Sequence, residues 1–158
     1  ERITPLLENG NRKLWITGHS LGAAIGTLTA YRLEREDNIS VQGVYTFGSP
    51  AVGNNGWAAE YAALVSNTHR WNIELDPVPV VFPLAPTGIF QHIGTCNNLY
   101  QDGSVILDDP DTLWYIPTPT IFPSDVFDEI IEKHGGYLAR LTTEILIYEP
   151  EMAELLTL

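Results

Sequence analysis

The chain has 158 residues, of which 44% are hydrophobic and 18% charged, a composition that excludes a disordered protein and allows one domain, or part of one, with a substantial core. Its 20 acidic and 8 basic residues give a net charge of -12, which argues against nucleic acid as a partner. The longest apolar stretch, residues 77–90, is broken by Pro79, Pro83 and Pro86, so no transmembrane segment is expected.

The first half of the chain predicts alternating strands and helices. Strands are expected at residues 14–17, 41–47 and 68–75, the first of them buried, and helices at 20–36 and 57–65. Because connections of this kind join parallel strands, the alternation favours an α/β fold with a mostly parallel sheet flanked by helices.

The second half is less regular. Short strands are expected at 91–94 and 104–107, and Asp102-Gly103 is typical of a hairpin turn. Residues 108–124 predict a long ordered loop, and 125–148 a helical pattern interrupted at Gly135-Gly136. Since no repeat or linker divides the chain, we expect residues 1–158 to form a single domain.

The segment that carries chemistry is Gly18-His19-Ser20-Leu21-Gly22, which fits G-x-S-x-G between a predicted strand and a predicted helix. A serine raised on such a sharp turn can be reached by a histidine, and the flanking glycines leave room for the turn. The backbone N–H of Leu21, at the start of the helix, is the expected donor to an oxyanion. A simple structural turn is the alternative.

A serine of this kind requires an acid and then a histidine later in the chain. Asp76 is the leading acid because it ends the third strand, although an ordinary turn aspartate would have the same position. The rivals lie in a turn that we interpret as solvated rather than as a calcium site: Asp108, Asp109 and Asp111.

Two histidines follow Asp76. His92 lies within a short apolar segment and is interpreted as a packed structural residue, whereas His134 precedes two glycines that can hold an imidazole over a cleft. His19 and His69 do not fit the required order. The residues alone favour His134 and leave His92 open.

Five segments in this order resemble the class 3 lipases of the α/β-hydrolase superfamily. They are LWITGHSLGAA (14–24), VYTFGSPAVGN (44–54), Asn72 with DPVP (76–79), QHIG (91–94) and HGGY (134–137). The resemblance implies that Ser20, Asp76 and His134 form a catalytic triad and that His92 is structural. The family's upstream strands, lid helix and second oxyanion donor have no counterpart, so we expect a domain that is incomplete at its N-terminus.

The resemblance implies a serine ester hydrolase that acts on acylglycerol lipids through an acyl-enzyme, makes transient contact with lipid interfaces and needs no cofactor or metal. Candidate acyl-pocket residues are Trp114, Tyr115 and Ile116, which could instead pack within their own domain. The alternatives are a lipase-like binding protein without turnover and an esterase or thioesterase for soluble substrates. The lone Cys96 leaves the compartment undecided, with a bacterial cytoplasm slightly favoured over secretion.

Overall fold

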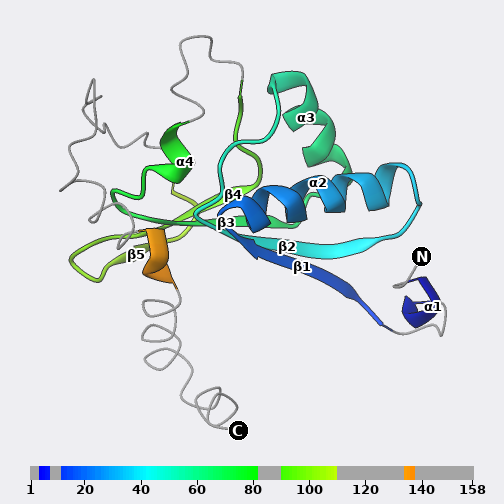
Figure 1. Ribbon diagram of the computed structural model, residues 1–158, viewed down its shortest axis with the longest axis horizontal. Coiled ribbons are helices and arrows are strands. Elements are labelled where there is room, and N and C mark those ends of the chain that lie inside the picture. Colours follow the sequence, from blue (N-terminus) through cyan, green and yellow to red (C-terminus); the bar gives the residue numbers. More distant parts are fainter. Residues whose placement is uncertain (1–3, 8–11, 82–89, 110–133, 138–158) are drawn as a thin grey trace, which may run out of the picture.

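The computed structural model of the protein describes residues 4–7, 12–81, 90–109 and 134–137. Within these ranges the centre is a five-stranded sheet in the order β1-β2-β3-β4-β5 (Figure 1). The first four strands are parallel, and β5 is antiparallel to β4. The elements are α1 (Thr4–Leu7), β1 (Leu14–His19), α2 (Leu21–Arg35), β2 (Val41–Phe47), α3 (Asn55–Leu64), β3 (Thr68–Ile73), α4 (Val78–Val81), β4 (Thr95–Leu99) and β5 (Val105–Ile106).

The main core lies between the sheet and the two long helices, which cover the same face of the sheet (Figure 1). Small residues on α2 allow it to approach the strands closely, since Ala23 and Ala30 are fully buried. Helix α3 begins where the Asn54 side chain accepts a hydrogen bond from the backbone N–H of Trp57. The buried members of this core are Ala30, Leu33, Val41, Val44, Ala58, Tyr61, Val65 and Ile93. The predicted α/β fold is therefore confirmed.

A second, smaller apolar cluster contains Ile73, Leu99 and Tyr137. Successive side chains of a strand point to opposite faces, so Phe47 packs against this cluster while Val44, three residues earlier, belongs to the main core. Tyr137 joins the cluster from residues 134–137, which follow β5, the last strand among the described residues, far along the sequence. Because its ring packs against Ile73 and Leu99, residues 134–137 lie at the end of the sheet where β3 and β4 finish.

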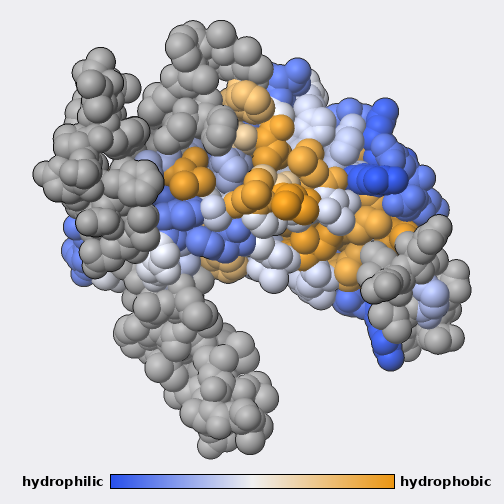
Figure 2. Space-filling view, viewed as in Figure 1, coloured by the Kyte–Doolittle hydropathy of each residue, from blue (hydrophilic) through white to orange (hydrophobic). Residues whose placement is uncertain are grey.

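Strand β1 is less buried than the sequence suggested. It pairs with β2 alone among the described residues, and Trp15 is 51% exposed. Helix α2 also carries exposed apolar side chains, and Figure 2 shows them as an orange area over this helix. They are Leu21, Ile25 and Leu28, spaced to lie on one face. The prediction of a buried first strand is therefore wrong for this structure.

The strand expected at 91–94 is also wrong. Gln91 forms an isolated bridge with Gly53, and the strand that follows β3 is instead Thr95–Leu99. Gly94 lies against the start of β3 with a φ of +68°, and a Cβ there would lie 2.4 Å from the Thr68 carbonyl oxygen. The chain therefore reaches the sheet one residue after this glycine.

Other predicted boundaries shift by a few residues. Strand β3 ends at Ile73 rather than at residue 75, because Leu75 adopts a φ of +67° in the turn that follows. The hairpin at Asp102-Gly103 is present and joins β4 to a two-residue β5. Most of the loop predicted at 108–124 and of the helix predicted at 125–148 lies outside the described residues. Among the described helices, none combines the length and the hydropathy of a membrane-spanning segment.

Candidate active site

Ser20 lies between β1 and α2, at the sharp turn that the sequence predicted. Its backbone has φ 57° and ψ -127°, a region that side-chain-bearing residues rarely occupy. The backbone N–H of Ser20 donates to the Phe47 carbonyl at 3.0 Å, which ties the turn to the end of β2. Such local strain is held in place by the surrounding strands and is a frequent feature of nucleophiles at this kind of turn.

The two glycines of the motif have different surroundings. A Cβ on Gly18 would lie 2.3 Å from the Gly22 carbonyl oxygen, so only glycine fits there. A Cβ on Gly22 would meet no heavy atom of the described residues within 4 Å. The close approach at Gly18 supports the expected need for glycine there, whereas the described residues show no contact that requires glycine at position 22.

Leu21 is the first residue of α2, and its backbone N–H belongs to the helical turn that lacks internal acceptors. The Ser20 carbonyl, by contrast, already accepts from the N–H groups of Ala23 and Ala24. A partial positive charge at the helix N-terminus adds to the donor capacity of this position. The Leu21 N–H is therefore suitable for binding a negatively charged oxygen next to Ser20.

Asp76 follows β3 after a tight turn and is completely buried. The turn is closed by a hydrogen bond from its own N–H to the Ile73 carbonyl at 3.0 Å. The backbone N–H of Val78 donates to its Oδ1 at 3.0 Å, at the start of α4. Because a buried carboxylate needs donors, these contacts determine how its oxygens are presented.

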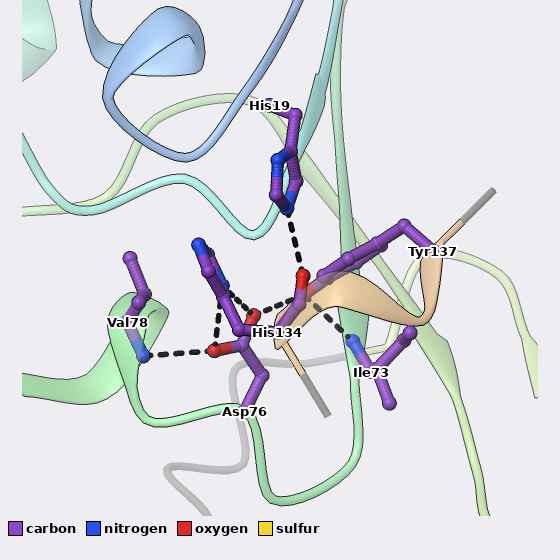
Figure 3. A network of polar contacts seen from close by, with 6 residues as sticks. All are labelled: His19, Ile73, Asp76, Val78, His134 and Tyr137. Carbon is purple, nitrogen blue, oxygen red and sulfur yellow. Dashed lines mark hydrogen bonds and ion pairs between the residues drawn. The ribbon is translucent and has the colours of Figure 1, made fainter. Parts of the chain in front are cut away.

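The imidazole of His134 contacts this carboxylate, although the two residues are 58 positions apart (Figure 3). Its Nδ1 lies 3.0 Å from both Oδ1 and Oδ2 of Asp76. The opposite ring atom, Nε2, is buried and has no hydrogen-bond partner among the described residues. This arrangement places the proton on Nδ1 and leaves Nε2 able to accept another proton.

Tyr137 is a further partner of Asp76 that sequence reasoning did not assign. Its hydroxyl donates to Oδ2 at 2.5 Å and accepts from the backbone N–H of Ile73 at 3.0 Å. Burial, together with the neighbouring Asp76 charge, raises the pKa of the Tyr137 phenol well above its usual value. The phenol therefore stays protonated and donates. Its spacing of three residues from His134 was the only signal in the sequence.

Gly48 lies directly beneath these three side chains, just after β2. It has a φ of +55°, and a Cβ there would lie 2.7 Å from Asp76 Oδ2, 2.9 Å from the Tyr137 ring and 3.0 Å from the His134 ring. The site is thus packed against bare backbone. Nothing in the sequence indicates that Gly48 lies beside the imidazole.

His19 also contacts this cluster, from the other side (Figure 3). Its Nε2 lies 2.8 Å from the backbone carbonyl oxygen of His134, and the two imidazole rings have centroids 4.6 Å apart. The motif residue that was expected only to flank the serine is therefore in contact with the residue that was expected to act as base.

The rival residues lie in other networks. His92 contacts the Pro79 carbonyl through Nε2 at 2.5 Å, in keeping with the expected structural role. Asp109 accepts hydrogen bonds from Asn98 and from the Tyr100 hydroxyl at 2.8 and 2.6 Å. No cluster of three or more metal-ligating side chains occurs in the described ranges. Asp111 and the candidate pocket residues Trp114, Tyr115 and Ile116 lie outside them.

Comparison with known families gives the broader context. Residues 1–85, more than half of the chain, match the family described as Lipase (class 3). The chain belongs to this family. This lipase segment is 40% identical over 81 residues to the secreted mono- and diacylglycerol lipase A of Penicillium camembertii, and 31% identical over 169 aligned positions to a triacylglycerol lipase of Nicotiana tabacum.

These matches cover 51% and 94% of the class 3 lipase chain but only 26% and 27% of the two relatives, so the chain spans about a quarter of their length. A solved structure of a triacylglycerol lipase with a serine protease triad at its catalytic centre superimposes with a TM-score of 0.53 at 30% identity. That comparison covers 61% of this chain and 37% of the solved one. The likeness supports the α/β-hydrolase type of fold.

Proposed function

We propose that the protein is a serine ester hydrolase, with Ser20 as nucleophile, His134 as general base and Asp76 as the residue that orients the base. The supporting observation is the contact of His134 Nδ1 with both oxygens of the buried Asp76, which leaves a buried, unpaired Nε2 among the described residues. The backbone of His134 is linked to His19, the direct neighbour of the strained Ser20.

In the proposed reaction, Nε2 of His134 takes the hydroxyl proton as Ser20 attacks the ester carbonyl carbon. The carbonyl oxygen becomes negative and is bound by the Leu21 N–H. Asp76 stabilises the imidazolium that forms. Collapse of this intermediate breaks the ester bond, the alcohol leaves with the proton from His134, and an acyl-Ser20 remains. Water, activated by His134, then releases the carboxylic acid.

Acylglycerols are the proposed substrates, since both curated relatives described above are named as lipases of this class. The enzyme would then bind its substrate at a lipid–water interface. The Penicillium relative is named as secreted, which favours secretion over the cytoplasm for this protein, against the slight preference drawn from the sequence. We further propose that residues 1–158 belong to one domain, because the described strands share one sheet.

The two alternatives receive less support. A binding protein without turnover would not require the buried Asp76–His134 pair, which costs desolvation free energy and is typical of functional sites. An esterase for soluble substrates would use the same side chains. The physical state of the substrate separates it from a lipase, because only a lipase gains rate when its ester forms an emulsion.

The test is labelling of the 158-residue chain with a fluorophosphonate, together with hydrolysis of a soluble p-nitrophenyl ester and of an emulsified diacylglycerol. Circular dichroism reports folding, and Ser20→Ala is the matched variant. We expect labelling and hydrolysis that disappear with Ser20→Ala, by several powers of ten in turnover. A folded chain that takes no label, or a Ser20→Ala variant that retains hydrolysis, would contradict the proposal.

A further inference from the structure

His19 flanks Ser20 in the sequence, but its side chain also makes a hydrogen bond to the main chain of His134. His19 is the last residue of β1 and pairs with Phe47 in the sheet, so its backbone position is determined by the strand. Its side chain reaches across 115 positions of sequence to the His134 carbonyl oxygen at 2.8 Å. The residue next to the nucleophile therefore holds the main chain of the residue proposed as base.

We propose that His19 is a positioning residue, which keeps the His134 imidazole at a constant distance from Ser20 by donating its Nε2–H to the His134 carbonyl. This inference rests on the proposed function. A carbonyl oxygen only accepts hydrogen bonds, so Nε2 of His19 must carry the proton. His19, the donor, ends β1 directly before Ser20. Asp76, which follows β3, orients the His134 ring through Nδ1.

The contacts from Asp76 and from His19 restrict different movements of His134. The contact from Asp76 to Nδ1 orients the imidazole ring, but it does not prevent the His134 backbone from moving relative to β1. The bond from His19 restricts that movement, since it joins the His19 side chain, at the end of β1, to the main chain of His134. The His19 ring also lies 4.6 Å from the His134 ring and 5.4 Å from the Tyr137 ring, between centroids. A shift of about 1 Å in such a base can cost roughly 100-fold in rate.

The test compares three variants that differ in donor position, using the soluble ester and the complete 158-residue chain. His19→Gln places an amide N–H near the original Nε2, His19→Asn carries the same amide one methylene shorter, and His19→Phe keeps an aromatic ring without a donor. We expect kcat to fall roughly five- to tenfold for the Asn and Phe variants, the value of one hydrogen bond, and to stay within about twofold for Gln. KM should not change, because His19 does not bind the ester in this proposal.

His69→Phe is the matched control. His69 also stacks on a ring, that of Tyr45 at 5.1 Å, and contacts one oxygen, Oδ1 of Asn67, but it lies near the start of β3, away from the strand ends that carry Ser20 and Asp76. Its kcat should equal that of the wild type. Thermal unfolding of every variant shows whether any loss of kcat is a loss of folded protein, and the Gln and Asn pair decides the question even if the Phe variant does not fold.

Equal kcat values for the Gln and Asn variants, whether both are normal or both reduced, would overturn the positioning role, since the donor would then not matter. If the wild type shows no Ser20-dependent hydrolysis, the proposed function fails and the positioning role fails with it. If hydrolysis depends on Ser20 and all three His19 variants keep the wild-type kcat, only the positioning role fails.

Discussion

The hydroxyl of Tyr137 donates to Oδ2 of Asp76 at 2.5 Å, so the same buried carboxylate contacts two side chains from one short segment, His134 and Tyr137. The two contacts have different consequences. The phenol donates to Oδ2 of Asp76 whatever the protonation state of the imidazole. The contact with Nδ1, by contrast, strengthens when the imidazole becomes protonated. Figure 3 shows the carboxylate with Val78 on one side and Tyr137 on the other, each bonded to it.

Tyr137→Phe should reduce both stability and turnover. The change removes a donor from Asp76 and an acceptor from the Ile73 N–H, two groups in a buried setting, which costs about 1–3 kcal/mol of unfolding free energy. Urea unfolding measures the first effect and kcat on a soluble ester the second. Tyr61→Phe, which removes one buried hydroxyl bonded to Thr68 in the main core, is the control and should lower stability alone. A kcat that falls equally in both variants would show that Asp76 does not depend on the phenol.

Asp76→Asn should leave the fold nearly intact and lower kcat by about 10⁴-fold, the loss known when an amide replaces the acid of a serine triad and the imidazole adopts the wrong tautomer. Asp109→Asn is the matched control, because Asp109 is also buried and accepts two side-chain hydrogen bonds. Steady-state kinetics on the two variants decides between the acids that the sequence proposed. A larger loss of kcat with Asp109→Asn than with Asp76→Asn would contradict the assignment of Asp76 as the acid.

Gly48→Ala should be destabilising by about 1–3 kcal/mol and should also reduce turnover, because the added methyl group meets Asp76, Tyr137 and His134 at 3.0 Å or less. Gly103→Ala provides the comparison. Its φ of +86° imposes the same kind of backbone strain, but a Cβ there meets nothing within 4 Å. Thermal unfolding and kcat should therefore both change at position 48, whereas only unfolding changes at position 103. Unchanged kcat with Gly48→Ala would mean that the site tolerates displacement of these three side chains.

Alkaline pH should weaken the fold through Tyr61. Burial raises the pKa of this phenol to about 12 from an ordinary value of 10.0. A pKa that is higher in the folded state than in the unfolded state gives stability that is complete below pH 10 and is lost as the pH rises toward 12. The expected slope is about 1 kcal/mol per pH unit in that window, measured by urea unfolding from pH 9 to 11.5. Tyr61→Phe should reduce this slope without abolishing it, because the raised pKa of Tyr137 adds a loss of the same sign. An unchanged slope in this variant would assign the loss to other groups.

The elements that depend on local sequence were predicted well. The turn around Ser20, helix α2 and the parallel arrangement of β1, β2 and β3 follow from glycine spacing, apolar runs and the alternation of strands and helices. Asp76 and His134 were selected as a pair from chain order and family resemblance, and the structure brings them into contact. These inferences succeed because each uses the preferences of a few consecutive residues or the order of motifs along the chain.

Tertiary structure alone decided the remaining features of the site. The strand after β3 begins at Thr95, and not at residue 91, because Gly94 takes a left-handed conformation against Thr68. Gly48 lies under the imidazole and His19 reaches the His134 carbonyl only because β1, β2 and β3 end at the same edge of the sheet. Tyr137 donates to Asp76 because its ring packs with Ile73 and Leu99. The contacts of His19 and Tyr137 join residues 115 and 61 positions apart, and local sequence preferences carry no information on which distant side chains burial will bring together.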